Sequence, residues 1–165
     1  MKRIQVSKNF YADEFFSESH YLALLKAGRE DIIKLLIDSR IIAATQYERD
    51  LFGPTYINTW YNKYDGGKRQ WSGIRLVGSP YFSENSMHSY RCLAVDTISP
   101  KASAEEKREH IRKNYAKWRE LGITRIESKI AVRDDKGRIL YYNNPTWLHK
   151  DVGFTGMANL KEITV

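Results

Sequence analysis

The sequence predicts an α+β fold in a single domain that spans residues 1–165. Apolar residues recur at three- and four-residue steps in the segments 30–52 and 104–121, which indicates amphipathic helices. Three later runs are rich in β-branched and aromatic residues, which is typical of strands. With 165 residues, 42% of them hydrophobic, the chain can bury one core and has little room for a second.

The first part of the chain is predicted to contain an arm, helical turns and one strand. Residues 1–29 are expected to form an N-terminal arm or helix that packs on the domain. The pattern over 30–52 fits one helix or two short ones, and the Gly-Pro pair that follows should end it. Residues 55–61 then carry the β-branched and aromatic side chains of a strand.

Residues 62–92 are predicted to be a functional loop region. They are rich in Gly, Ser, Asn and Pro, they are too long for a simple connector, and they are too aromatic for a flexible linker. A helix should follow at 104–121, with Ser103 as its N-cap and Gly122 beyond its end. The closing strands are predicted at 123–130, 138–143 and 147–152, and a hairpin turn at 134–137 joins the first two.

The net charge of +7 favours contact with polyanions, but it does not choose among nucleic acid, anionic lipid and the polymers of a bacterial envelope. Glutamates interrupt the densest basic stretch, 101–119, so we interpret it as a solvated helix face, and nucleic acid as an unfavoured partner. The single cysteine, Cys92, excludes an intramolecular disulfide and is expected to be a small buried hydrophobe. No apolar run is long enough for a signal peptide or a membrane span, so we expect a protein made soluble in the cytoplasm, without membrane insertion.

Two of the four histidines have carboxylates near them in the sequence. Asp96 follows His88 at a distance of eight residues, and Asp151 follows His149 at a distance of two. Histidine and carboxylate ligands suit a hydrolytic zinc ion, which commonly takes three protein ligands and keeps one position open. Taken alone, however, a histidine near an aspartate is more often a surface residue or part of an ordinary hydrogen bond in the core.

A set of short segments gives these residues a context. In chain order they are Ile57-Asn58-Thr59-Trp60 with Gly66-Gly67, Ser72-Gly73-Ile74-Arg75, Ser79-Pro80-Tyr81-Phe82-Ser83, Ser86-x-His88, Ala94-x-Asp96, Ser103-Ala104-Glu105-Glu106, Ile123-Thr124-Arg125-Ile126-Glu127 and Trp147-Leu148-His149-x-Asp151-Val152. The ordered set, which spans about residues 30–155, resembles the zinc D-Ala-D-Ala metallopeptidases, particularly small phage-encoded peptidoglycan peptidases. The resemblance implies a hedgehog/DD-peptidase-like fold, a small antiparallel sheet with helices packed on one side.

The resemblance also implies a metal site. It makes His88, Asp96 and His149 the ligands of one zinc ion, which would activate a water molecule as the nucleophile. Asp151 lies two residues beyond the last ligand and hence on the same strand face, so it could hold that imidazole in its metal-binding tautomer. An ordinary surface role for Asp151 remains open.

Other residues receive roles in substrate binding and transition-state stabilisation from the same resemblance. Arg75 would steady a substrate carboxylate or the developing oxyanion. Trp60, Tyr81 and Ser86 would contact the substrate. These roles predict a groove that runs past the metal and is lined by the loop region.

The sequence departs from the family pattern at two points. Relatives usually have seven residues from the first ligand to the second, whereas His88 and Asp96 are separated by eight, with Cys92 in the additional stretch. A bulge or longer turn could absorb the difference, or the difference could spoil the geometry.

Relatives often carry a catalytic Glu at the position of Thr146, and a threonine cannot serve as a general base at neutral pH. Glu127 is the candidate replacement, since its strand should lie beside the strand of the last ligand, although a surface role stays open.

The leading hypothesis is therefore a zinc peptidase that acts on peptidoglycan, as a D,D-carboxypeptidase or an L-Ala-D-Glu type endopeptidase. It would act on the bacterial cell wall after release, or as part of a phage particle. The first alternative is a catalytically weak or inactive domain of the same fold in a virion or tail, in contact with other virion proteins. The second is a nucleic-acid-binding module, which rests only on charge and aromatic content.

Overall fold

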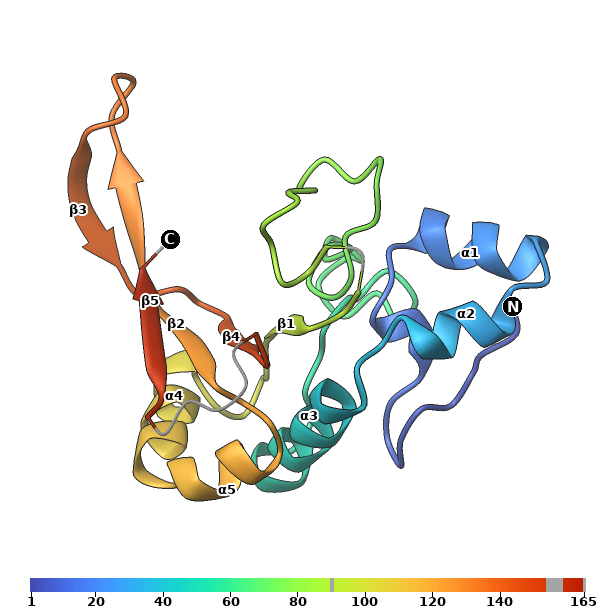
Figure 1. Cartoon of the computed structure of the whole chain (residues 1–165), viewed down its shortest axis with the longest axis horizontal. Coiled ribbons are helices and arrows are strands. Elements are labelled where there is room, and N and C mark those ends of the chain that lie inside the picture. Colours follow the sequence, from blue (N-terminus) through green and yellow to red (C-terminus); the bar gives the residue numbers. More distant parts are fainter. Residues whose placement is uncertain (90, 154–158, 165) are drawn as a thin grey trace.

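The computed structural model describes residues 1–89, 91–153 and 159–164 and has an α+β architecture (Figure 1). Its helices are η1 (Ala12–Glu14), α1 (Glu18–Lys26), α2 (Glu30–Leu35), α3 (Ser39–Phe52), α4 (Ala104–Lys113) and α5 (Tyr115–Glu120). Its strands are β1 (Ala94–Thr97), β2 (Arg125–Arg133), β3 (Ile139–Asn143), β4 (Leu148–Asp151) and β5 (Lys161–Thr164). None of the described helices is long and apolar enough to cross a membrane.

The strands form one sheet in the order β1-β4-β2-β3, with antiparallel pairing throughout that path. The predicted strands 123–130, 138–143 and 147–152 correspond to β2, β3 and β4. Two strands were not predicted. β1 pairs with β4 at the edge nearest the loop region, and β5 adds a parallel pairing to β2.

The helices begin and end where the sequence indicates, with two interruptions. Asp38 accepts a hydrogen bond from the backbone of Arg40 and so caps α3, which divides the 30–52 segment into two helices. Ser103 and Glu106 form a reciprocal capping box at the start of α4. The 104–121 segment is also divided, because Asn114 has non-helical backbone angles between α4 and α5.

Helices α3, α4 and α5 lie on one side of the sheet (Figure 1). Side chains from α3, α4, β1 and β4 meet there around Glu48, which is fully buried. The N-terminal part packs beside this body through buried aromatic side chains. Those rings belong to Phe10, Phe15, Phe16 and Tyr21.

The strand predicted at 55–61 is wrong. Its backbone groups pair with three different segments and not with one ladder: Tyr56 pairs with Ile98, the amide of Asn58 donates to the carbonyl of Glu14, and the amide of Thr59 donates to the carbonyl of Arg69. The apolar side chains that suggested a strand are buried for a different reason. They fill the junction between the N-terminal part and the loop region, where Ile57 and Trp60 are buried.

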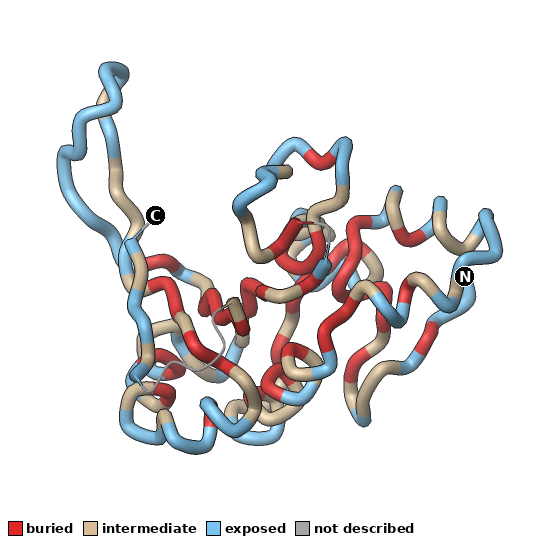
Figure 2. Tube along the Cα trace, viewed as in Figure 1, coloured by how far each residue is buried: buried red, intermediate tan, exposed pale blue. Residues whose placement is uncertain are grey.

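The outer part of the β2–β3 hairpin extends from the body of the molecule. Every residue of β3 is exposed (Figure 2). The predicted turn is present, since the amide of Gly137 donates to the carbonyl of Asp134 at 2.9 Å. The base of β2 is buried and the tip is not, so only the base contributes to the core and to the site described next.

Candidate metal centre

The β1–β4 ladder brings two of the predicted ligands together. Asp96 and His149 are direct partners in the register, so their side chains leave the sheet on the same face. Their neighbours Thr97 and Lys150 leave it on the opposite face, toward α3. Period-two alternation therefore separates a ligand face from a core face in both strands.

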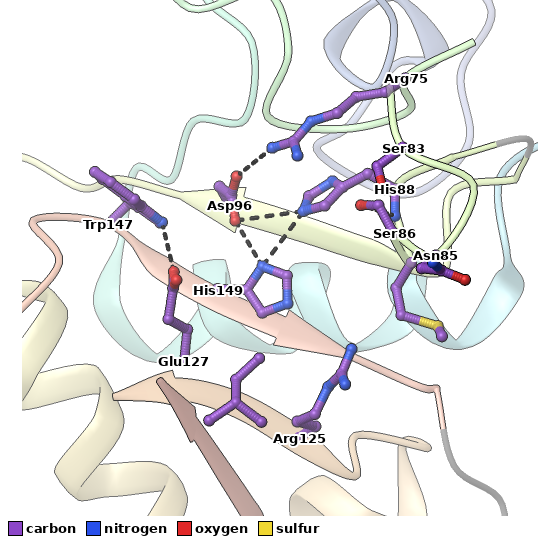
Figure 3. Close-up of a pocket in the computed structure, with 12 residues that line it drawn as sticks. Arg75, Ser83, Asn85, Ser86, His88, Asp96, Arg125, Glu127, Trp147 and His149 are labelled. Carbon is purple, nitrogen blue, oxygen red and sulfur yellow. Dashed lines mark hydrogen bonds and ion pairs between the residues drawn. The ribbon is translucent and has the colours of Figure 1, made fainter. Parts of the chain in front are cut away.

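His88 approaches this face from the loop region. Its carbonyl accepts a hydrogen bond from the amide of Arg75 at 2.8 Å, which ties the two segments together. Its ring points toward Asp96 and His149 (Figure 3). The sequence interval of eight residues therefore does not separate the two predicted ligands in space.

Three ligand atoms converge on one point. Nδ1 of His149 lies 2.8 Å from Oδ1 of Asp96 and 3.3 Å from Nε2 of His88. The third distance, from Nε2 of His88 to Oδ1 of Asp96, is 3.6 Å. The three residues are all buried. Within the described residues, this is the one group of His, Cys, Asp and Glu side chains with the spacing of a metal site.

Hydrogen bonds to the outer nitrogens determine which ring nitrogen of each histidine faces the group. Nδ1 of His88 lies 2.7 Å from the carbonyl oxygen of Gly73, which can only accept, so Nδ1 carries a proton and Nε2 can offer a lone pair. Nε2 of His149 lies 3.1 Å from Oδ2 of Asp151. That carboxylate accepts the Nε2 proton and leaves Nδ1 to face the group, which is the role predicted for Asp151.

The pKa values of the three groups show how their charges are shared. Burial lowers the pKa of His88, against the opposing charge of Asp96. Burial also disfavours protonation of His149, but hydrogen bonds to Asp151 and Asp96 outweigh it and raise the pKa to about 9. The pKa of Asp96 is lowered, because His88 and His149 outweigh the burial that favours its neutral form. The three side chains thus share one proton between their facing atoms. A metal cation bound between these atoms could take the place of that proton.

Gly73 explains why the Ser-Gly-x-Arg segment can support His88. A Cβ at this position would lie 2.2 Å from the carbonyl oxygen of Phe15, so a side chain cannot be accommodated. The close approach lets the next amide, that of Ile74, donate to the same oxygen at 2.7 Å. The carbonyl of Gly73 is thereby fixed where it accepts the proton of His88.

Arg75 lies at the site, where it forms an ion pair with the candidate ligand Asp96. Its Nη2 donates to Oδ2 of Asp96 at 3.1 Å, and its Nε donates to the carbonyl of Trp71 at 2.8 Å. The guanidinium therefore holds the oxygen of Asp96 that faces away from the histidines. This charge-assisted contact fixes the orientation of the carboxylate.

Glu127 and Trp147 line the same cavity, which has a volume of about 400 Å³ and opens onto the three ligand atoms. The predicted neighbourhood of the two strands is confirmed, since β2 pairs with β4. The indole Nε1 of Trp147 donates to Oε2 of Glu127 at 3.1 Å (Figure 3). Burial raises the pKa of Glu127, and the nearby charge of Asp96 adds to this effect while His149 opposes it.

Cys92 stays outside the site. It is fully buried, pairs with Ile37 through the backbone, and directs its Sγ to the carbonyl of Ala94 at 3.3 Å. Burial raises the pKa of its thiol above the ordinary range. The structure thus agrees with the prediction of a buried small hydrophobe.

The three predicted substrate contacts have different positions. Ser86 lines the cavity and accepts a hydrogen bond from the amide of His88 at 3.2 Å. Tyr81 is exposed and lines a neighbouring cavity beside Asp96. Trp60 does not reach either cavity. Its indole is buried and donates to the carbonyl of Phe16 at 2.8 Å, so it belongs to the core of the N-terminal part.

Sequence reasoning missed two sets of supporting residues. Arg125 pairs with Oδ2 of Asp151 at 2.6 Å, the same oxygen that contacts Nε2 of His149, and it lines the cavity. Glu48 accepts hydrogen bonds from Thr97, Lys107 and Lys150 on the core face of the ligand strands. The spacing of Arg125 and Glu127, two residues apart on one strand, was a signal for the first set. No short-range pattern indicated the second.

The described residues thus form a buried His88-Asp96-His149 group that could bind a metal ion, at the floor of a cavity lined by a protonatable carboxylate. No protein-family model, curated protein or solved structure matches this chain. The chemistry of the site is therefore inferred from its own geometry.

Proposed function

We propose that this protein is a zinc-dependent peptidase that hydrolyses peptide bonds of bacterial peptidoglycan, with a hedgehog/DD-peptidase-like fold. One observation carries the proposal: two histidines and one aspartate converge on a point that opens into a cavity containing Glu127. Three protein ligands beside an accessible space are the usual arrangement of a catalytic zinc, whereas structural zinc sites are closed by four protein ligands.

The spacing of the ligand atoms supports zinc. In a tetrahedral zinc site with bonds of about 2.0–2.1 Å, ligand atoms lie roughly 3.3–3.4 Å apart. The three distances here, 2.8, 3.3 and 3.6 Å, surround that value. Magnesium and calcium prefer sites made mainly of oxygen, so a set of two imidazoles and one carboxylate argues against them.

The side chains around the ligands have the properties that amide hydrolysis needs. Zinc bound there would supply a Lewis acid and lower the pKa of a water molecule. Glu127, held by Trp147 and with its pKa raised by burial, can take a proton at its carboxylate and pass it to the leaving amine. Arg75 keeps Asp96 oriented and leaves a positive charge at the cavity wall, where it favours a developing oxyanion.

The substrate assignment rests on the resemblance of the ordered sequence segments and on charge. A net charge of +7 suits an anionic wall polymer. The cleaved bond would be that of a D,D-carboxypeptidase or of an L-Ala-D-Glu type endopeptidase. Within this proposal, the protein is phage-encoded, and it reaches the wall after release or as part of a particle.

The test combines metal analysis with wall digestion. We expect the purified protein to contain zinc at close to one ion per chain and to release peptides from purified peptidoglycan. His149→Ala should lose both the zinc and the activity, because one of three ligands is removed. The assignment of the site is wrong if His149→Ala retains as much zinc as the parent.

Thr146 favours one alternative, a domain of the same fold that retains the metal for stability and serves as a structural component of a virion or tail. The usual catalytic Glu is missing at this position, and its neighbour Trp147 turns toward Glu127. Zinc content without any digestion of peptidoglycan by the parent protein would support this alternative. Digestion that depends on Glu127 would exclude it.

A further inference from the structure

A second cavity, of about 300 Å³, lies beside the candidate metal centre on the Asp96 side. It shares Asp96, Arg75 and Trp147 with the first cavity, so the two meet at the ligand carboxylate. Cationic and aromatic side chains dominate the rest of its lining, which comprises Lys68, Arg69, Gln70, Trp71, Ser72 and Tyr81. Asp96 is the one acidic residue of this lining.

The two guanidinium groups of this cavity differ in their partners. Arg75 already donates to Asp96 and to the carbonyl of Trp71. Arg69 donates only its Nε, to the carbonyl of Ile57 at 3.3 Å, and it forms no ion pair with any residue that the structure describes. It is nevertheless half-buried, and burial lowers its pKa. A partly desolvated guanidinium without a carboxylate is costly unless an external anion completes it.

The neighbouring carboxylates are occupied elsewhere. Asp65 accepts from the hydroxyl of Thr59 and from the backbone amide of Lys68. Asp96 is shared by His149 and Arg75. Neither lies within ion-pair distance of Arg69, so the two terminal nitrogens of Arg69 remain for a ligand that enters the cavity.

We propose that Arg69 binds a free carboxylate of the substrate, in a subsite formed by the second cavity. This inference rests on the proposed function and adds its substrate preference: a peptide with an ionised carboxylate close to the cleaved amide. A guanidinium can bind a carboxylate through two parallel hydrogen bonds. Trp71 and Tyr81 provide apolar walls for the atoms next to that carboxylate.

The contacts of Arg75 and Arg69 indicate different roles for the two side chains. Arg75 orients Asp96 and has its charge where an oxyanion would develop, whereas Arg69 binds the substrate carboxylate. This differs from the expectation that Arg75 itself holds the substrate carboxylate. Lys68, which is exposed at the rim, adds positive charge that attracts the anion without fixing its orientation.

The test measures binding on the zinc-loaded full chain, with the fluorescence of Trp71 and Trp147 as the signal. The probes are N-acetyl-D-alanine and its primary amide, which differ only in the carboxylate. The parent should bind the acid at least tenfold more tightly than the amide. Arg69→Gln should lower affinity for the acid about tenfold or more and remove the preference, since a charge-assisted hydrogen bond is lost.

Two variants control the experiment. Arg119→Gln removes the same charge from an exposed position on α5 that lines neither cavity, and it should bind both probes as the parent does. Arg69→Lys keeps the charge without the planar fork and should retain only part of the preference. Equal binding of acid and amide by the parent overturns the inference, as does an unchanged preference in Arg69→Gln. If the Arg69 variants do not fold, the comparison of the two probes on the parent still decides.

Peptidoglycan digestion by the same preparations separates this inference from the proposed function. A parent that digests the wall but binds acid and amide equally overturns the subsite alone. A parent that prefers the acid through Arg69 but digests nothing supports the subsite and removes the peptidase assignment.

Discussion

The indole of Trp147, the residue directly before β4, donates a hydrogen bond to Glu127 of the neighbouring strand β2. Trp147 lies two residues before the ligand His149 and one residue after Thr146. The segment that leads into the strand of His149 therefore also orients a carboxylate of β2. Trp147 thus holds a carboxylate in the cavity onto which the candidate ligands open.

Glu127→Gln should give a folded, zinc-loaded protein with activity on peptidoglycan lowered by about 10²–10⁴-fold, the usual effect of removing a general base. Gln keeps an oxygen that can accept from Trp147 but cannot take a proton. Zinc content and peptide release are measured on the same sample. Trp147→Phe leaves the carboxylate without its donor and should lower kcat about tenfold with little change in KM. Full activity in Glu127→Gln would remove this residue from the reaction.

Asp151→Asn should weaken zinc binding by about 10–100-fold, as loss of a carboxylate behind a ligating imidazole commonly does. The carboxylate fixes which nitrogen of His149 faces the metal, and it lies 3.1 Å from the other nitrogen. Competition with a chelator of known affinity measures the change. Thermal unfolding in excess chelator shows whether the metal-free fold is intact. Equal zinc affinity in parent and variant would leave Asp151 as a partner of Arg125 alone.

Gly73→Ala should reduce zinc affinity although it changes no ligand. The new methyl group would collide with the carbonyl of Phe15, so the segment that supports His88 must shift. Gly78→Ala is the matched control in the same loop region, since no atom lies within 4 Å of its added Cβ. Its positive φ of 94° gives it a backbone cost of its own, which thermal unfolding records. Zinc affinity should fall only in Gly73→Ala, and equal affinities would show that His88 does not depend on this close approach.

Glu48→Gln should lower the free energy of unfolding by about 3–5 kcal/mol, because it leaves two buried ammonium groups without a carboxylate. Lys107 and Lys150 both donate to Glu48, and all three side chains are buried. Lys107→Met leaves one cation with one anion and should cost less. Urea unfolding of the two variants gives the comparison. A larger loss in Lys107→Met than in Glu48→Gln would contradict this account of the network.

Glu14→Gln should change how stability depends on pH. Burial raises the pKa of Glu14 to about 7, although hydrogen bonds from Tyr61 and from the amide of Tyr11 oppose it. A raised carboxyl pKa favours the folded state at low pH, and this contribution is lost as pH rises from about 4.5 through 7. The loss is on the order of 3 kcal/mol. Gln does not titrate, so urea unfolding at pH 4.5 and 8 should show the variant gaining on the parent at the higher pH. A constant difference between the two proteins would contradict the shift.

The ligand group could be predicted from the sequence because its signals are local. His149 and Asp151 alternate on one short strand, and the segments around His88 and Asp96 occur in a recognisable order. The helix limits were also predictable, since Ser103 and Gly53 act on their immediate neighbours. The structure brings His88, Asp96, His149, Asp151 and Glu127 to one place.

The remaining features depend on contacts between distant segments. Trp60 was predicted to contact the substrate. Its indole instead donates to the buried carbonyl of Phe16, which lies 44 positions away in the sequence. The ion pairs of Glu48 join residues up to 102 positions apart. The sequence singles out Arg75 through the Ser-Gly-Ile-Arg segment, but only the structure shows that Arg75 pairs with Asp96 and that Arg69 does not. β5 follows residues of mixed character and depends on the exposed edge of β2.

The three candidate ligands do not come from equally rigid parts of the chain. Asp96 and His149 face each other within a strand pair, whereas His88 belongs to a long segment without a ladder of its own. An ion held by all three would therefore cross-link the sheet and that segment. It would do what a disulfide does in other proteins, which this chain, with a single cysteine, cannot form within itself. Loss of the ion frees one end of this cross-link, and the same segment carries both arginines. When such an ion binds, residues 62–89 should therefore be better protected from proteolysis, and chelation should remove that protection.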